Sequence, residues 1–425
     1  MIDKNKIMEY CDLVIYICLC LVIFCLPFAK AGVEVFTWMA IIFWIAKRVF
    51  GYRSGCLWKT LPETELNKAL GILIAVNALS MIFSSHFGLS LRGFFGKELK
   101  FLAIYFMLVE TVRSKERLKY LLITIIASVI LITLDASTQL FSGVDFLRGY
   151  KMDQVTFGAS FAAASGFAAW LIIIIPLLIG IIATNIIPSV KLKNLLAVII
   201  VAQALFLLRT YSRGAWIGFV ISSILMFYYF TKNFSSKIKL LYLSVAICLV
   251  AGYLFLPRSL IFSVKDSIRV KFKFSQTISG RIKTIPQIAT GSNFERIRWW
   301  KESLRIIKDY PLVGCGLNTY SVVGRLYKSF DGGGIYPHNS YLQMAAETGL
   351  LGLFAFLWFL FMFFRIGLRY FNQNRDVLVL GLLTGISAFL IHAIFDTHLY
   401  SLQLVVLFWY MVGLTVAMIK LDQKI

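Results

Sequence analysis

A histidine and three further polar residues occupy the start of an apolar run near the C-terminus. Asn339 comes directly after His338, and Gln343 and Glu347 follow it at intervals of four residues. A helix therefore places Asn339, Gln343 and Glu347 on one face. Polar side chains within a membrane helix face protein or water, because exposure to lipid is costly. We interpret His338 as a general base, since a neutral imidazole can accept the proton of an attacking hydroxyl. The alternative is a hydrogen-bond network that packs helices together.

Three arginines lie near the beginnings of predicted helices. Arg213 opens an apolar run within TYSRGAWIG, and Arg296 and Arg298 lie in the first turns of a helix predicted over 292–310. Helix N-termini favour anions, and a guanidinium holds a phosphate through two parallel hydrogen bonds. We therefore predict that Arg213 and Arg296 bind phosphate. Snorkelling to the membrane surface is the alternative for Arg213, and a solvated basic face is the alternative for Arg298.

The predicted helix over 292–310 has an apolar stripe. Its members recur at helical spacing: Ile297, Trp300, Leu304 and Ile307. Pro311 is expected to end the helix. We expect the helix to lie on the membrane bundle or at the membrane surface.

The segment IHAIFDTHLY, residues 391–400, adds a carboxylate and two histidines. Asp396 has the chemistry to orient a base or to stabilise its charge. His392, Asp396 and His398 are also acceptable metal ligands, but three residues of this kind are a weak metal signature. No P-loop and no dinucleotide fingerprint precedes a helix. We predict a site without metal or cofactor, and no ATP-driven transport.

Composition places the chain among membrane proteins. Hydrophobic residues make up 59% of it and the mean hydropathy is +0.79, whereas soluble domains are about 45–50% apolar. The predicted fold class is all-α: a polytopic integral membrane protein of about twelve transmembrane helices with one long helical loop on the outer side. The helices are predicted at 13–29, 33–46, 69–85, 99–111, 119–140, 155–184, 194–209, 214–231, 240–256, 340–364, 377–395 and 399–419.

The basic residues orient these helices. The net charge of +22 fits basic cytoplasmic loops better than nucleic-acid binding, because 21 basic residues fall in the predicted inner loops and 8 in the short outer ones. Both termini are then cytoplasmic. The chain divides into helices one to nine over 1–256, an outer loop over 257–337, and helices ten to twelve over 338–425. This topology puts Arg213, Arg296, His338 and Asp396 on the outer side.

Two arginines, a histidine and a carboxylate on one face suggest group transfer from a lipid diphosphate. The arginines would offset the charge of a leaving diphosphate, and the histidine would activate a hydroxyl. A transporter would also have a basic cavity among many helices, but a carrier site is expected near the membrane midplane.

Three motifs resemble the O-antigen ligase and O-antigen polymerase superfamily over about residues 200–365. They are TYSRGAW, RIRWWKESLRIIKDYPLVGCGLNTY and PHNSYLQMAAETGLLGL. The resemblance implies about twelve helices with a helical periplasmic loop in the bacterial inner membrane. It implies a glycosyltransferase whose donor is an undecaprenyl-diphosphate-linked glycan, without nucleotide sugar or metal. In ligases the acceptor is lipid A–core oligosaccharide; in polymerases it is a second lipid-linked repeat unit.

The same resemblance assigns residues to roles. Arg213, Arg296 and His338 take the positions of the ligase arginines and base, and Asp396 matches a late carboxylate. Arg298 is expected to bind the donor diphosphate together with Arg213 and Arg296, and Asn339, Gln343, Glu347 and Asp396 are expected to support the site. The leading hypothesis is an O-antigen ligase, the alternative is a repeat-unit polymerase, and a polysaccharide-lipid transporter comes third. The glycine run at 332–334 is interpreted either as a hinge for the outer loop or as a plain loop.

Overall fold

The computed structural model describes residues 4–53, 61–152, 157–161, 163–184, 186, 188–231, 292–328 and 336–423. The predicted span 240–256, the glycine run 332–334 and most of the predicted outer loop lie outside the described residues. Over the described ranges the chain is helical, apart from turns and one antiparallel bridge between Val144 and Lys151. The prediction of an all-α protein is confirmed for this part of the chain.

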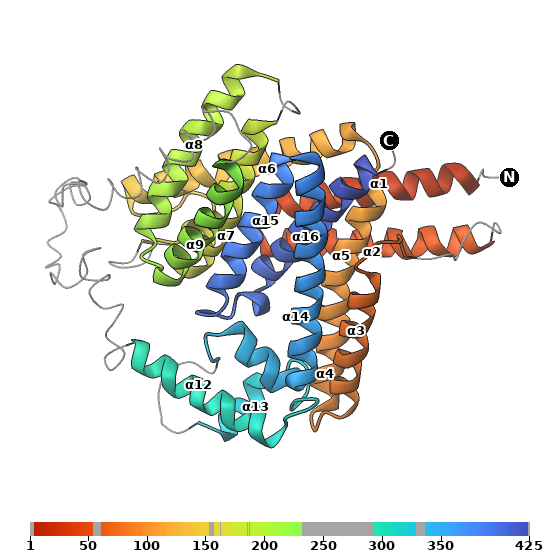
Figure 1. The fold of residues 1–425 in the computed structure, drawn as a ribbon, viewed down its shortest axis with the longest axis vertical. Coiled ribbons are helices and arrows are strands. Elements are labelled where there is room, and N and C mark those ends of the chain that lie inside the picture. Colours follow the sequence, from red (N-terminus) through yellow and green to blue (C-terminus); the bar gives the residue numbers. More distant parts are fainter. Residues whose placement is uncertain are drawn as a thin grey trace, which may run out of the picture. The chain divides into compact units, whose positions relative to one another are not determined.

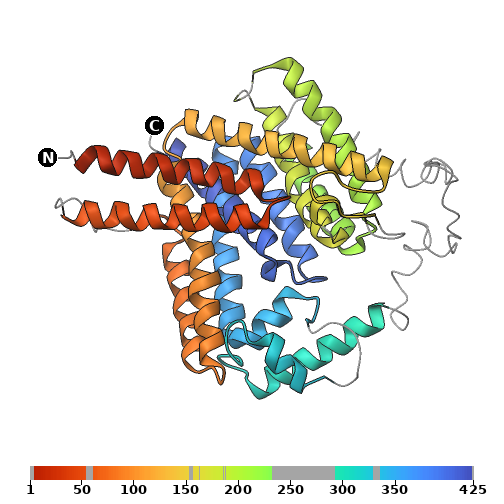
Figure 2. The ribbon, with the colours of Figure 1, turned by 180° about the vertical axis from the view of Figure 1, so that it is seen from behind.

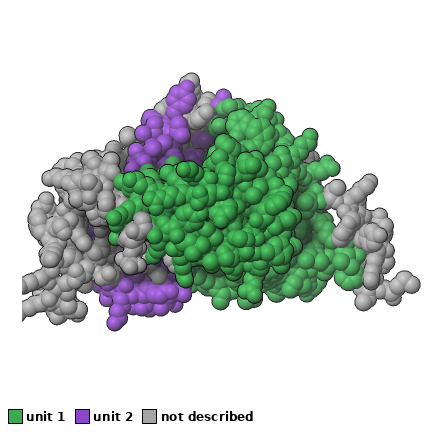
Figure 3. Space-filling model, turned by 90° about the horizontal axis from the view of Figure 1, so that it is seen from below, with its two compact units in different colours: residues 1–125, 291–373, 393–425 green, residues 126–290, 374–392 purple. Residues whose placement is uncertain are grey.

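The chain forms two compact units (Figure 3). Unit 1 comprises Met1–Ile125, Gly291–Gln373 and Ala393–Ile425, and unit 2 comprises Ile126–Thr290 and Asn374–His392. The predicted site residues Arg296, His338 and Asp396 belong to unit 1, while Arg213 belongs to unit 2.

Unit 1 contains His338 and most of the described helices. They are α1 (Lys4–Cys25), α2 (Lys30–Arg53), α3 (Asn67–Ile82), α4 (Phe87–Gly93), the π-helix η1 (Phe94–Glu98), α5 (Leu99–Thr111), α12 (Ser292–Asp309), α13 (Tyr320–Leu326), α14 (Ser340–Asn374), the 3-10 helix η4 (His398–Tyr400) and α16 (Leu402–Asp422). The helices α1 and α2 run side by side (Figure 1, and Figure 2 from behind). The helix α16 is buried along nearly its whole length and packs on α5.

Unit 2 is a smaller bundle. The helix α6 (Lys115–Ser142) runs into it from unit 1, and η2 (Ala159–Phe161), α7 (Ala164–Ala183), α8 (Val190–Arg209), α9 (Arg213–Thr231) and α15 (Val377–His392) follow. The helices α7 and α15 are in backbone contact, because a Cβ at Gly381 would lie 2.5 Å from the Pro176 carbonyl oxygen. Small residues allow such close helix packing within a membrane.

Six described helices are long and apolar enough to cross a membrane: α1, α6, α7, α8, α14 and α16. The helices α3 and α15 and the first part of α9 are apolar but shorter. Every predicted span within the described residues contains a helix, but the count of twelve spans stays a prediction. The run at 155–184 forms a regular helix only from Ala164, and Pro176 lies inside that helix.

Candidate functional site

His338 and Asp396 are in direct contact. The imidazole Nδ1 of His338 lies 2.9 Å from Oδ1 of Asp396. The His338 backbone has a φ of 47°, a left-handed conformation uncommon for any residue but glycine. Asn339 then begins α14, since its side-chain oxygen accepts hydrogen bonds from the backbone N–H groups of Tyr341 and Leu342. The amide predicted to support the base therefore acts as the cap of the helix that follows the base.

The turn between α15 and α16 is fastened to the start of α14, which brings Asp396 to His338. The Ser340 backbone N–H donates to the Ala393 carbonyl at 2.9 Å, and the Ser340 hydroxyl donates to the Asp396 carbonyl at 2.9 Å. Both contacts fix the backbone on either side of the pair. The geometry of the His338–Asp396 pair therefore does not depend on one flexible side chain.

The helix α12 covers the His338 imidazole. The ring of Trp299 lies 5.1 Å from that of His338, tilted by 36°, and the indole N–H of Trp300 donates to the Pro337 carbonyl at 3.0 Å. The two adjacent tryptophans of RIRWW thus contact His338 and the residue before it. The apolar stripe of the predicted helix did not indicate these contacts. Arg296 precedes them by one helical turn and is half-buried, whereas Arg298 is exposed.

The charges of Arg296 and Asp396 affect one another. Burial lowers the pKa of the Arg296 guanidinium and the negative Asp396 opposes this; arginine nevertheless stays protonated in proteins. Burial would raise the pKa of Asp396, but its hydrogen bonds with the His338 ring and the Thr397 backbone N–H hold that pKa well below the usual range. Asp396 is therefore an anion at neutral pH.

An ionised Asp396 sets the tautomer of His338. A carboxylate is only an acceptor, so Nδ1 of His338 donates to it, and in the neutral ring Nε2 keeps its lone pair. That arrangement is what a general base requires. Beside the pair, burial lowers the pKa of His398 to about 4, so His398 is neutral above that pH.

Glu347 does not reach the His338–Asp396 pair but holds the segment after α12. Its two carboxylate oxygens accept from the backbone N–H groups of Asn318 and Tyr320, at 2.9 and 3.1 Å. The Gln343 amide donates to the same carboxylate at 3.2 Å. Gln343 and Glu347 thus stabilise the segment after α12, and the part that the polar stripe plays in the site stays a prediction.

A break in α14 at Gly349 makes this docking possible. Gly349 has φ 70° and ψ −178°, and beyond it the backbone N–H groups of Leu350 and Leu351 donate to the carbonyls of Pro311 and Leu312. A Cβ at Gly349 would lie 2.0 Å from the Leu312 carbonyl oxygen. Only glycine suits both this conformation and this close approach.

Arg213 is the first residue of α9 in unit 2 and is half-buried. The adjacent Ser212 hydroxyl lies 3.1 Å from Nε2 of His392, and the Trp216 indole donates to the Leu207 carbonyl. The TYSRGAW motif is thereby anchored to α15 and α8. Within unit 1 the structure brings Arg296, His338 and Asp396 together; the addition of Arg213 to them stays a prediction.

The alternative metal site is divided between the units. His392 ends α15 in unit 2, whereas Asp396 and His398 lie in unit 1 and Asp396 is paired with His338. Among the residues that the structure describes, no three His, Cys, Asp or Glu side chains form a group that could hold a metal ion. The predicted metal independence itself stays a prediction.

Sequence reasoning missed a cavity of 440 Å³ in unit 1, lined in part by Lys97, Glu98, Lys100, Glu347 and Tyr400. The helices α4, η1 and α5 form one continuous rod whose π-helical turn contains Lys97 and Glu98. Such turns are frequent at functional sites. The sequence feature that could have indicated this cavity is GKELK, residues 96–100, which places three charged residues at the start of an apolar run. Its two lysines served only as evidence for the membrane orientation of the chain.

Comparison with known proteins agrees with the motifs. A family model described as O-Antigen ligase matches residues 195–357. The match contains TYSRGAW, the α12 motif and the start of α14, and ends before Asp396. No curated protein matches the chain. The resemblance to this superfamily is confirmed over the matched segment.

Proposed function

We propose, for a multi-pass membrane protein whose residues 195–357 match the O-antigen ligases, that it transfers a glycan from undecaprenyl diphosphate to a sugar hydroxyl of lipid A–core oligosaccharide. The observation that carries the proposal is the His338–Asp396 pair, 2.9 Å apart and covered by the arginine-bearing α12. We place the reaction on the periplasmic face of the bacterial inner membrane, with both termini cytoplasmic, as the distribution of basic loops predicts.

In the proposed reaction His338 takes a proton and a diphosphate leaves. The acceptor hydroxyl gives its proton to Nε2 of His338 while its oxygen forms a bond to the anomeric carbon of the donor sugar. The bond between that carbon and the diphosphate oxygen breaks, and the electron pair leaves with undecaprenyl diphosphate. Asp396 stabilises the imidazolium through Nδ1 and so favours proton transfer.

The arginines are proposed to offset the charge of the leaving group. Arg296 is half-buried beside Asp396. The effective dielectric constant is lower at a partly buried site than in bulk water, so the guanidinium attracts a diphosphate more strongly there. Arg213 is proposed as the second phosphate ligand, and the exposed Arg298 as a weaker contact. Asn339, Gln343 and Glu347 support the site by shaping the start of α14 and the turn after α12. No metal is required in this scheme.

The test is transfer by the purified full-length protein, in lipid nanodiscs, with excess EDTA present. The donor is undecaprenyl-diphosphate-linked glycan, offered with either lipid A–core or a second lipid-linked repeat unit as acceptor. We expect product on lipid A–core, loss of product with His338→Ala, and normal activity with His86→Ala, a half-buried histidine outside the pair.

Other outcomes assign another function. Product only on the lipid-linked acceptor identifies a repeat-unit polymerase, which the family match covers equally. Movement of donor across the membrane without transfer identifies a transporter. Activity that EDTA stops and Mg²⁺ or Zn²⁺ restores contradicts the role given to the arginines.

A further inference from the structure

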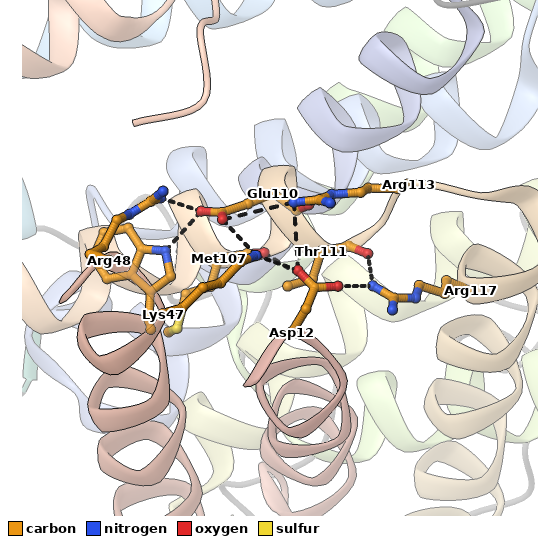
Figure 4. A network of polar contacts seen from close by, with 9 residues as sticks. Asp12, Lys47, Arg48, Met107, Glu110, Thr111, Arg113 and Arg117 are labelled. Atoms are coloured by element: carbon orange, nitrogen blue, oxygen red, sulfur yellow. Dashed lines mark hydrogen bonds and ion pairs between the residues drawn. The ribbon is translucent and has the colours of Figure 1, made fainter. Parts of the chain in front are cut away.

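A second group of charges surrounds the C-terminal end of α5 (Figure 4). Two carboxylates and four cations take part: Asp12, Glu110, Lys47, Arg48, Arg113 and Arg117. The Lys47 ammonium bridges the two acids, at 2.5 Å from Asp12 and 2.8 Å from Glu110. Arg117 binds Asp12, and Arg48 and the indole N–H of Trp44 bind Glu110.

The cations of this group outnumber its acids, so their charge is not balanced locally. Each carboxylate side chain is only 9% exposed and already has close partners. Arg113 lies at the edge of the group, 54% exposed, with its terminal nitrogen 3.6 Å from Asp12 and 3.9 Å from Glu110. Its Nε donates to the Glu110 carbonyl, which holds the guanidinium over the end of α5.

A cavity of 300 Å³ lies beside this group within unit 1. Three cations line it, Arg48 and Arg113 from the group and Lys420 from the last turn of α16. Glu110 is the only acid in its described lining, and Lys47 and Arg48 already neutralise that acid. Val112, Ala417 and Leu421 supply an apolar floor. A cationic rim over an apolar floor matches a ligand with an anionic head and an apolar body.

The cavity is about one membrane thickness from the proposed active site. The helix α16 begins at Leu402, shortly after Asp396, and reaches Lys420 near its end. Its 21 residues span roughly 31 Å at about 1.5 Å per residue, close to the roughly 30 Å of a bilayer core. With Asp396 on the outer side, as the charge distribution predicts, a helix of this length places the cavity among the headgroups of the opposite leaflet.

We propose that this cavity binds the phosphate headgroup of an anionic phospholipid of the opposite, cytoplasmic leaflet. Arg113 grips the phosphodiester with its planar fork, Lys420 adds a point charge, and the apolar floor receives the first carbons of the acyl chains. A lipid is favoured over free phosphate because the cavity sits where apolar helices end and has an apolar floor. This site is independent of the glycan transfer proposed above.

The test is lipid binding by the purified full-length protein, measured by native mass spectrometry during titration with phosphatidylglycerol. We expect one tight phosphatidylglycerol, and weak binding of zwitterionic phosphatidylcholine. Each basic residue at a membrane surface contributes about fivefold in affinity, so Arg113→Gln with Lys420→Gln should raise Kd about thirtyfold. Arg113→Lys keeps the charge but loses the planar fork, so it should weaken binding, though by less than Arg113→Gln does.

The matched control is Arg369→Gln. Arg369 is 45% exposed and paired with Glu65, and it does not line the cavity, so its loss should leave Kd unchanged. Equal weakening by Arg369→Gln would replace the site with a diffuse basic surface. Competition by inorganic phosphate as effective as that of the lipid would make it a free-phosphate site. If the double variant does not fold, Lys420→Gln alone decides, and an unchanged Kd overturns the proposal.

Discussion

Asp396 accepts a hydrogen bond from His338 at 2.9 Å although the two residues are 58 positions apart in the chain. A carboxylate held in this way fixes the imidazole tautomer and stabilises the cation that forms when the base works. Asp396→Asn keeps the shape and removes the charge. We expect transfer to fall about 10²–10⁴-fold, as for loss of a general base.

Donor binding separates this effect from misfolding. The Asp396→Asn variant should still bind undecaprenyl-diphosphate-linked glycan, measured by native mass spectrometry. The control is Asp309→Asn, which removes a carboxylate that pairs with Tyr327 and should leave the transfer rate unchanged. Normal transfer by Asp396→Asn would show that the pair has no part in catalysis.

The buried His398 should make the fold sensitive to acid. Its pKa is lowered to about 4 by burial, against about 6.5 when unfolded. Between these values the unfolded chain binds more protons, so stability falls as pH is lowered through this window, by up to about 3 kcal/mol. Asp396 contributes little above about pH 5, because its carboxylate is then almost fully ionised in both states.

His398→Gln removes this titration. We would measure the Tm of the detergent-solubilised protein between pH 7 and pH 4. The decrease in Tm over this range should be smaller for the variant than for the wild type. The comparison isolates His398, because every other residue is the same in the two proteins. Parallel Tm curves for the two proteins would contradict the burial argument.

The arginines should differ in importance according to their burial. Arg296→Lys and Arg213→Lys keep a charge but lose the planar fork, and we expect each to reduce transfer by at least tenfold. Arg298→Lys changes an exposed residue on the same helix as Arg296 and should reduce it by less than threefold. Comparable losses for Arg296 and Arg298 would point to a basic surface instead of a defined phosphate site.

Gly349 should be required for the fold. Gly349→Ala places a Cβ 2.0 Å from the Leu312 carbonyl oxygen in a backbone with φ 70°, so the docked turn after α12 must move and the unfolding free energy should fall by about 2 kcal/mol or more. The matched control is Gly71→Ala in α3, where the added Cβ meets nothing within 4 Å and helix propensity improves. A Tm equal to that of the wild type would contradict the close approach.

The sequence predicted which residues begin helices better than which faces are buried. The helix over 292–310 is confirmed as α12, and Arg296 lies in its first turns. Protein covers its expected apolar stripe only in part, because Leu304 is 55% exposed while Ser303 is fully buried. Ser303 is buried because its hydroxyl pairs with Tyr320 at 2.7 Å, a contact between two helices that periodicity does not reveal.

The break at Gly349 and the His338–Asp396 pair were hidden for a related reason. Gly349 stands at the start of an apolar run, directly after Glu347 and Thr348, and its left-handed conformation is needed only because residues 311–316 dock there. Asp396 stood out as a carboxylate near the membrane, but its partner depends on how the turn between α15 and α16 is fastened to Ser340. Contacts between segments far apart in the chain determine both the break at Gly349 and the His338–Asp396 pair. Such contacts cannot be predicted from a single sequence.

Chemical rescue of His338→Gly tests the central claim most directly. Glycine suits the left-handed backbone at this position, so the variant removes the imidazole without straining the chain. Transfer should fall about 10²–10⁴-fold, and added imidazole should restore it in a concentration-dependent manner while donor binding stays constant. Full activity without imidazole, or a loss that imidazole does not restore in a variant that still binds donor, would contradict the assignment of His338 as the base.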